Sequence, residues 1–336
     1  MKYNFLIFIT FSLLLLSCQS ENEIFVSIVR SDHFPEFTYD FESNPITKKR
    51  FELGKMLFND PRLSIDNSVA CSNCHVKGVA FTDPQHNPSV GINNSVGTRN
   101  APMIANMAFQ NEFLWDGGVT HLDFVSVFAI ENEKEMGETI DGVVKKLRQI
   151  EEYQLSFQDV YSKLDSITSP YMLRAISDYL AVLISDQSKY DKVVRGELSF
   201  TTEEMEGKLI FDAKCASCHS GALFTNKEFM NNGLDTAFED IGRSLISETD
   251  DDLGKFKVPS LRNITLTAPY MHDGRFKDLD QVLDHYSENV KWSSTLAEEL
   301  QDGTQLGIQL TIEEKERLKT FLETLTDYEF ISNPMF

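Results

Sequence analysis

The 336-residue chain has little cysteine, little tryptophan and a deficit of positive charge. Its 31 Lys and Arg stand against 52 Asp and Glu, which gives a formal net charge of −21. A nucleic-acid-binding surface needs the opposite balance, so this composition argues against nucleic acid as a partner. After the N-terminus no segment is apolar enough to cross a membrane, and no tract is of low complexity. The acidity either keeps the protein soluble or recruits a basic partner.

Four of the five cysteines belong to two copies of one pentapeptide. Cys71, Cys74 and His75 form the first C-x-x-C-H motif, and the same pattern recurs later in the chain. In this motif two thiols form thioethers with the porphyrin vinyl groups, and the adjacent histidine takes one axial position on iron. The sequence therefore predicts two covalent c-type haems. The second is held by Cys215, Cys218 and His219.

The fifth cysteine, Cys18, follows an apolar run that extends from Phe5 to Leu16. The pattern is typical of a bacterial export signal with a lipobox, in which the cysteine becomes the lipidated N-terminus. A transmembrane anchor is the alternative, but the run is short for a bilayer. We expect a signal peptide at 1–17 and a polar tether at 18–46. The protein would be exported to the periplasmic face of a bacterial membrane and would contact it only through the lipid.

An internal repeat precedes the two haem motifs. The segments GKMLF (54–58) and GKLIF (207–211) stand before the first and the second motif. Thr201 and Glu204 form a capping-box pattern, after which Met205 and Leu209 share one helical face. In the first half Phe51, Met56, Leu57 and Phe58 follow Thr47 in the same way. The pattern in each half therefore predicts a helix that leads into a haem-binding turn.

Two further helices are expected. One covers about 171–183, and the other begins at the Thr311–Glu314 capping pattern. Leu318, Phe321, Leu322 and Leu325 form the buried face of the latter. No convincing alternating strand pattern appears beyond short pieces. The predicted fold is mainly α, with two cytochrome-c-like haem domains at 47–196 and 197–336 that meet near Gly196.

The chain resembles the bacterial di-haem cytochrome c peroxidases, a family that includes the methylamine-dehydrogenase maturation enzyme. The resemblance covers about residues 48–327. Seven motifs carry it: LFNDPRLS (57–64), AFTD (80–83), RNAP (99–102), LWDG (114–117), EMG (135–137), VPSLRN (258–263) and TAPYMHDG (267–274).

The resemblance implies that the N-terminal haem, with His75 as proximal ligand, reduces hydrogen peroxide to water. Glu135 matches the distal acid, and Trp115 matches the tryptophan between the haems. The haem held by His219 then supplies electrons from a small c-type cytochrome or a similar donor. A homodimer is compatible with the resemblance.

The distal side of the first haem departs from the family pattern. Family members that start inactive hold a distal histidine around the Ser-x-Gly pattern, where this chain has Ile92. His86 is a nearby rival, but we expect an open, peroxide-ready haem. Val125, Ala129 and Gly118 replace a usual Gln, Pro and Arg.

The second haem needs another axial ligand, and the resemblance aligns Tyr286 with it, fourteen residues after His272. The maturation enzyme has a tyrosine there, whereas methionine is usual and raises the potential. Met271 and His285 are rivals. The resemblance also implies a calcium ion between the domains. Its ligands would be Asn100, Thr267 and Pro269.

Two other functions remain open. Tyr286 and Ile92 favour a di-haem oxidase that modifies a protein or an organic substrate, as the maturation enzyme does. A di-haem electron carrier without catalysis is the other, and Glu135 argues against it.

Overall fold

The computed structural model describes residues 30–162, 164–303 and 305–336. The expected signal peptide at 1–17 and Cys18 lie outside the described residues. Within the described part of the chain, no helix has the length and apolar character that a membrane span requires.

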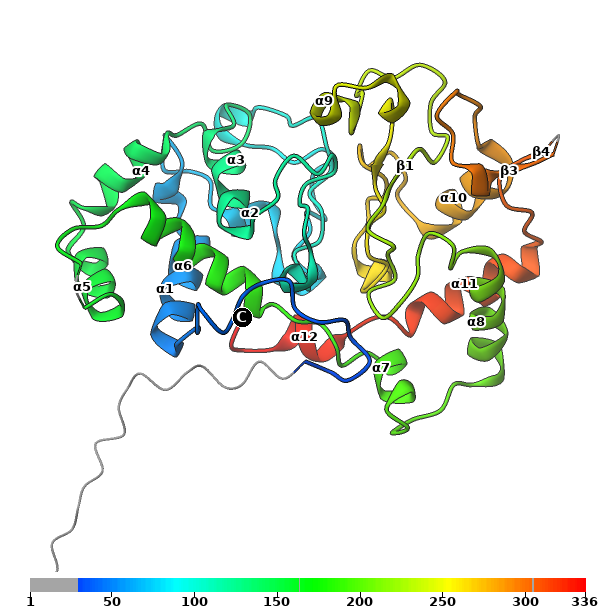
Figure 1. The fold of residues 1–336 in the computed structure, drawn as a ribbon, viewed down its shortest axis with the longest axis horizontal. Coiled ribbons are helices and arrows are strands. Elements are labelled where there is room, and N and C mark those ends of the chain that lie inside the picture. Colours follow the sequence, from blue (N-terminus) through cyan, green and yellow to red (C-terminus); the bar gives the residue numbers. More distant parts are fainter. Residues whose placement is uncertain (1–29, 163, 304) are drawn as a thin grey trace, which may run out of the picture.

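The chain forms two helical lobes that lie side by side (Figure 1). The fold is mainly α, as the sequence predicts. The helices of the first lobe are α1 (Lys48–Phe58), α2 (Cys71–Cys74), α3 (Val125–Glu131), α4 (Ile140–Leu147), α5 (Glu151–Val160) and α6 (Ser169–Val182). The remaining helices are α7 (Lys189–Val194), α8 (Thr202–Lys214), α9 (Ser244–Ser247), α10 (Leu279–Asp284), α11 (Ile312–Glu323) and α12 (Tyr328–Ser332).

Strands are confined to short pairs in the second lobe. The antiparallel pair β1 (Phe229–Met230) and β2 (Phe256–Lys257) joins two long loops. A second antiparallel pair consists of β3 (Gln301–Asp302) and β4 (Gln305–Leu306). This matches the expectation of short strand pieces only.

The first lobe is built on a close crossing of α1 and α6. Thr47 caps α1 by accepting a hydrogen bond from the backbone N–H of Arg50. The two helices approach so closely at Gly54 that a Cβ there would lie 2.0 Å from the carbonyl oxygen of Ala175. Only glycine permits this distance. The predicted helix at 171–183 is α6, within two residues at each end.

The second lobe repeats this crossing with α8 and α11. A Cβ on Gly207 would lie 2.0 Å from the carbonyl oxygen of Arg317. Both predicted capping boxes are present, at Thr201 with Glu204 and at Thr311 with Glu314. The repeat seen in the sequence is therefore a repeated helix crossing, and its glycine is the contact point.

The face of α8 that carries Met205 and Leu209 is exposed. Met205 and Leu209 share a face, but they are 44% and 61% exposed. The buried face instead carries Gly207 and Phe211, because α11 packs on the glycine side of the helix. The expected buried residues of α11 (Leu318, Phe321 and Leu322) and the following Leu325 are all buried.

The described part of the expected tether, residues 30–46, is folded against the protein. Phe34 is buried and packs on Phe109 and Leu223, one from each lobe. Tyr39 donates a hydrogen bond to the buried carboxylate of Asp178 in α6. Sparse apolar anchors in a polar stretch thus hold this segment across both lobes.

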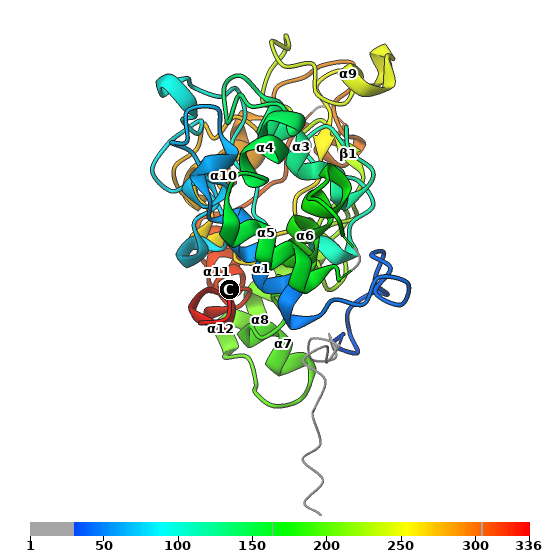
Figure 2. The same cartoon turned by 90° about the vertical axis from the view of Figure 1, so that its left-hand side faces the viewer.

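The C-terminal segment also crosses the predicted domain boundary. The helix α12 follows α11 but packs on the first lobe, where the Phe330 ring contacts Phe81. The amino group of Lys55 donates a hydrogen bond to the carbonyl oxygen of Met335. Conversely, Tyr190 of α7 packs on Phe224 and Phe321 of the second lobe. The side view places α7, α8 and α12 together at the lower end of the molecule (Figure 2).

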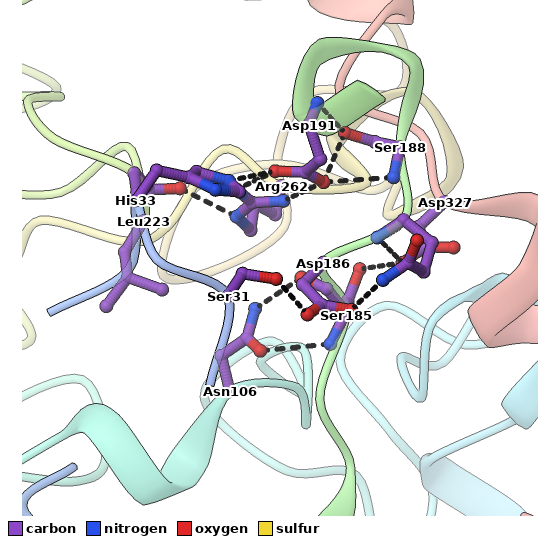
Figure 3. Close-up of polar contacts among 12 residues, drawn as sticks. Ser31, His33, Asn106, Ser185, Asp186, Ser188, Asp191, Leu223, Arg262 and Asp327 are labelled. Carbon is purple, nitrogen blue, oxygen red and sulfur yellow. Dashed lines mark hydrogen bonds and ion pairs between the residues drawn. The ribbon is translucent and has the colours of Figure 1, made fainter. Parts of the chain in front are cut away.

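A buried polar cluster joins these crossing segments (Figure 3). Arg262 of the second lobe and Asp191 of α7 are fully buried and form two hydrogen bonds of 2.7 and 2.8 Å. His33 of the N-terminal stretch contacts the same carboxylate at 2.8 Å. Burial alone would raise the pKa of Asp191, but hydrogen bonds from Arg262 outweigh it and hold the pKa at about 2.

The same cluster continues into the linker between the lobes. Asp327, at the start of α12, accepts hydrogen bonds from the hydroxyl of Ser185 and the backbone of Gln187. Asn106 of the first lobe exchanges hydrogen bonds with the backbone of Ser185. Residues from five distant parts of the chain therefore meet at one site and fix the lobes to each other.

Candidate functional site

Each haem motif places its histidine at the edge of a cavity with one ring nitrogen already engaged. The Nδ1 of His75 lies 2.8 Å from the carbonyl oxygen of Phe81, and that of His219 lies 3.2 Å from the carbonyl oxygen of Phe224. A carbonyl only accepts, so Nδ1 carries the proton and Nε2 is left as a lone-pair donor. Burial lowers the pKa of both histidines, to about 4 for His219. A neutral imidazole oriented by a carbonyl suits iron ligation.

The paired cysteines share these cavities. Cys71 and Cys74 line the first cavity and are free thiols, as are Cys215 and Cys218 in the second. The first cavity has a volume of about 1290 Å³ and the second about 240 Å³. Two thiols, one imidazole nitrogen and a largely apolar wall fit a covalent haem c in each lobe. The first cavity has far more room around that group than the second.

Glu135 lines the first cavity together with His75. Its backbone is fixed, because the carbonyl oxygen accepts a hydrogen bond of 2.9 Å from Ile92. The loop approaches so closely that a Cβ on Gly91 would lie 2.1 Å from the carbonyl of Lys134. Burial raises the pKa of the Glu135 carboxyl, while a 2.8 Å hydrogen bond from Asn132 opposes the rise. The group is thus held in place with its proton affinity increased.

The two residues expected near the distal side do not line this cavity. His86 sits on an exposed loop, with its Nδ1 3.3 Å from Asp83. Ile92 is buried and packs toward Gly137. The three departures from the family pattern do line it, namely Gly118, Val125 and Ala129. All three are smaller than the residues that the family resemblance would place there.

Trp115 lines both cavities. Its indole N–H donates a 2.8 Å hydrogen bond to the carbonyl oxygen of Asn100. Its own carbonyl accepts a 2.8 Å hydrogen bond from the backbone of Lys257 in the second lobe. One bond therefore fixes the ring and the other fixes the backbone that carries it, between the two sites. Trp292, by contrast, is 61% exposed.

An ion-pair network that sequence reasoning missed braces the Trp115 loop. Arg99 donates to Asp116 at 2.5 Å and to both carboxylate oxygens of Asp240 at 2.6 and 2.8 Å. The Arg99 guanidinium also lies over the Phe256 ring, which stacks on His272 with centroids 3.7 Å apart. Arg99 belonged to a recognised motif, but no local signal identified Asp240, which lies 141 positions away.

The second cavity contains two of the three expected axial ligands. Tyr286 and Met271 both line it, whereas His285 does not. The His285 Nε2 lies 2.9 Å from the carbonyl oxygen of Asn232, so this ring is turned to the backbone. Tyr286 lies in a π-helix, His285–Asn289, a distortion that is frequent at functional sites. Burial raises the pKa of the Tyr286 hydroxyl to about 12.

Two further residues of this cavity were not expected. The sulfur of Met230 lies 3.3 Å from the Sγ of Cys218. The amide nitrogen of Asn232 lies 3.3 Å from the sulfur of Met271. Both residues follow the second motif without a recognisable spacing, so only the fold brings them to it.

The residues expected to bind calcium lie along the wall of the second cavity. Asn100, Thr267 and Pro269 all line it, and the amide of Asn100 lies 2.6 Å from the carbonyl oxygen of Pro269. Rotating this amide by 180° would place its oxygen beside that carbonyl, as a shared cation requires. The described residues contain no cluster of three or more His, Cys, Asp or Glu side chains that could hold a metal.

The chain is similar to known proteins over most of its length. The family model for di-haem cytochrome c peroxidase matches residues 48–199. The methylamine utilization protein MauG of Methylorubrum extorquens is 31% identical over 302 residues, which cover 87% of this chain and 82% of that protein. Cytochrome c551 peroxidase of Nitrosomonas europaea is 31% identical over 281 residues, which cover 82% and 79%.

A solved structure agrees over nearly the whole chain. The crystal structure of a MauG-like protein associated with microbial copper homeostasis superposes with a TM-score of 0.82 and 30% identity, covering 91% of this chain and 97% of that one. A family of this kind implies two haem c groups, in accord with the two donor sets. The chain belongs to the di-haem cytochrome c peroxidase family.

Proposed function

We propose that this protein reduces hydrogen peroxide to water in the first cavity, with electrons from a small c-type cytochrome or a similar donor. The observation that carries the proposal is the position of Glu135, a half-buried carboxyl with a raised pKa in the same cavity as the His75 imidazole. A haem bound through His75 would supply an open axial position for peroxide and the electrons for cleavage of the O–O bond.

The side chains then handle protons and position. The Glu135 carboxylate accepts a proton from one peroxide oxygen and returns it to the other, which leaves as water. A raised pKa suits both halves of this transfer, and Asn132 keeps the carboxyl oriented throughout. The overall reaction takes up two electrons and two protons and forms two water molecules.

Electrons would pass from the second site to the first through the region of Trp115. The residue lines both cavities, its indole N–H is hydrogen-bonded to Asn100 and its backbone carbonyl to Lys257, which supports a fixed bridging role. The net charge of −21 suits a basic electron donor. The export signal and Cys18 support a lipid-anchored protein at the periplasmic face of a bacterial membrane.

A second candidate function is oxidation of an organic or protein substrate. The observation that favours it is the size of the first cavity, which three small residues line together with Glu135. Tyr286 in the second cavity also matches the maturation enzyme rather than the usual methionine. The two functions share the haem sites and differ in the molecule that is oxidised, which is either the electron donor or an organic or protein substrate.

Replacing Glu135 with glutamine tests the first proposal. Gln retains the size and accepts the bond from Asn132, but it cannot shuttle a proton. Peroxide turnover with a reduced small cytochrome should therefore fall by about 100-fold or more. Glu133→Gln, an exposed residue outside the cavity, is the matched control and should keep full turnover. Each variant should carry two haems by pyridine haemochrome assay. Unchanged turnover in Glu135→Gln would remove this residue from the mechanism.

The second candidate makes a different prediction for the wild-type protein. A peroxidase consumes peroxide only as fast as the cytochrome is oxidised. An oxidase would consume peroxide without a cytochrome when its substrate is present. Peroxide consumption that requires reduced cytochrome, in a fixed ratio of two electrons per peroxide, favours the first proposal.

A further inference from the structure

Asn232 stands between the two side chains that compete for the second haem. It lines both cavities and is the second residue after β1. Its amide nitrogen lies 3.3 Å from the sulfur of Met271, and its side chain also hydrogen-bonds to the hydroxyl of Tyr286, which lowers the pKa that burial raises. An amide NH₂ group has two N–H donors. One amide can therefore serve both candidate ligands.

The position of Asn232 is fixed by its backbone rather than by these two contacts. Its carbonyl oxygen accepts the bond from the His285 ring at 2.9 Å. The preceding Asn231 is buried and donates to Ser293 and Thr295, both at 2.9 Å. The backbone of Asn232 is thus held on both sides, and its side-chain amide can orient its neighbours.

Met271 is presented to the cavity by a constrained turn. Its φ of +75° lies in the left-handed region, which is unfavourable for a side chain of this size. Hydrogen bonds from Gly274 to Met271 and from Tyr270 to Phe276 hold the turn. The thioether is therefore kept within the cavity, where a hydrogen bond from the amide occupies a sulfur lone pair.

Tyr286 is presented by the π-helix on another side of the same cavity. Its carbonyl oxygen accepts a 2.6 Å hydrogen bond from Ile308, which fixes the backbone. A phenolate oxygen is negatively charged and keeps two lone pairs after it accepts one hydrogen bond, so it remains a strong donor toward ferric iron, whereas the neutral thioether keeps only one. The shared amide therefore weakens one ligand and orients the other.

We propose that Asn232 is a positioning residue that selects Tyr286 over Met271 as the axial ligand opposite His219. The proposal rests on the two haems of the proposed function but not on the peroxidase reaction. Loss of the amide donors frees the Met271 sulfur and loosens the Tyr286 hydroxyl. Ligation should then shift from oxygen to sulfur. Methionine ligation raises the reduction potential of a c-type haem.

The test is Asn232→Leu in the holoprotein, a change that keeps the volume, removes both donors and leaves the backbone contact with His285 in place. Asn232→Ala serves if the leucine variant does not fold. We expect the weak far-red charge-transfer band of methionine-ligated ferric haem to appear, with an upward shift in the potential of the second haem. Met271→Leu alone should leave the wild-type spectrum unchanged. The double variant Asn232→Leu/Met271→Leu should lack the new band.

Three results would overturn the proposal. The first is a second-haem spectrum and potential in Asn232→Leu identical to wild type. The second is a high-spin second haem without the thioether band, which would show that the amide only holds Tyr286. The third is a change caused by Met271→Leu alone, since Met271 would then already be the ligand. Haem content and peroxide turnover, measured on the same samples, separate these outcomes from failure of the proposed function.

Discussion

Replacing Gly54 with alanine should destabilise the first lobe, although alanine is the better helix former. A Cβ at this position would lie 2.0 Å from the carbonyl oxygen of Ala175 and 2.9 Å from the Cβ of Tyr179. Ordinary Cβ contacts begin at 3.4 Å, so the deficit against the carbonyl is about 1.4 Å. A backbone carbonyl within α6 cannot turn away, so α1 and α6 must separate.

Two opposing terms set the size of the effect. Alanine in a helix interior is favoured over glycine by about 1 kcal/mol. Overpacking typically costs about 1–3 kcal/mol, and a clash with backbone places this site at the upper end. The net loss of unfolding free energy is then about 2 kcal/mol. For a lobe of this size it corresponds to a melting temperature roughly 4–8 °C lower.

Thermal unfolding followed by circular dichroism, with haem absorbance recorded in parallel, measures this change. Gly207→Ala is the repeat of the experiment in the second lobe, where the Cβ would lie 2.0 Å from the carbonyl of Arg317. Gly78→Ala is the control, because a Cβ there meets nothing within 4 Å. It should alter stability by less than about 0.5 kcal/mol. If Gly54→Ala has the same melting temperature as Gly78→Ala, the repeated glycine is not needed for the close helix crossing.

Two further predictions concern the contacts between the lobes. The ionised Asp191 has a folded pKa of about 2 against an ordinary value of 3.8, so its contribution is present above about pH 4 and is lost as the pH falls toward 2. Asp191→Asn should lower the free energy of unfolding by about 3–5 kcal/mol at pH 7, because it leaves the Arg262 charge buried and unpaired. In urea titrations, the difference in unfolding free energy between wild type and variant should be about 2 kcal/mol smaller at pH 2 than at pH 7. A gap that does not change with pH would contradict the assigned pKa. For the proposed calcium ion, chelation with EGTA should slow peroxide turnover, and calcium but not magnesium should restore it. Turnover by Asn100→Ala should be insensitive to the chelator. Full turnover by a metal-free wild-type protein would exclude the site.

Local signals in the sequence account for the parts of the fold that were predicted. The capping boxes at Thr201 and Thr311 and the repeated glycine each depend on residues within one helix turn. The long-range returns carried no such signal. The stretch 30–46 is polar enough to suggest a tether, but a few buried side chains such as Phe34 anchor it. Met205 and Leu209 share a helix face as predicted, but spacing alone did not show that this face is exposed.

The candidate site divides in the same way. The haem motifs, Glu135 and Trp115 were found because each stands in a contiguous motif. Asn132 could have been found, since it lies three positions before the carboxylate that it contacts. Asn232 and Asp240 could not, because their partners lie 39 and 141 positions away in the sequence. Residues that orient a site from another loop are specified by tertiary structure alone.

The return of α12 to the first lobe has a consequence for the order of assembly. Lys77, two residues after the first haem motif, donates hydrogen bonds to the carbonyl oxygens of Asn333 and Phe336. These contacts span more than 250 positions, as the separations of 256 and 259 show. A chain that emerges N-terminus first cannot close this lobe until its last helix is available. The contacts of Lys77 with Asn333 and Phe336 can therefore form only after both ends of this long separation have emerged.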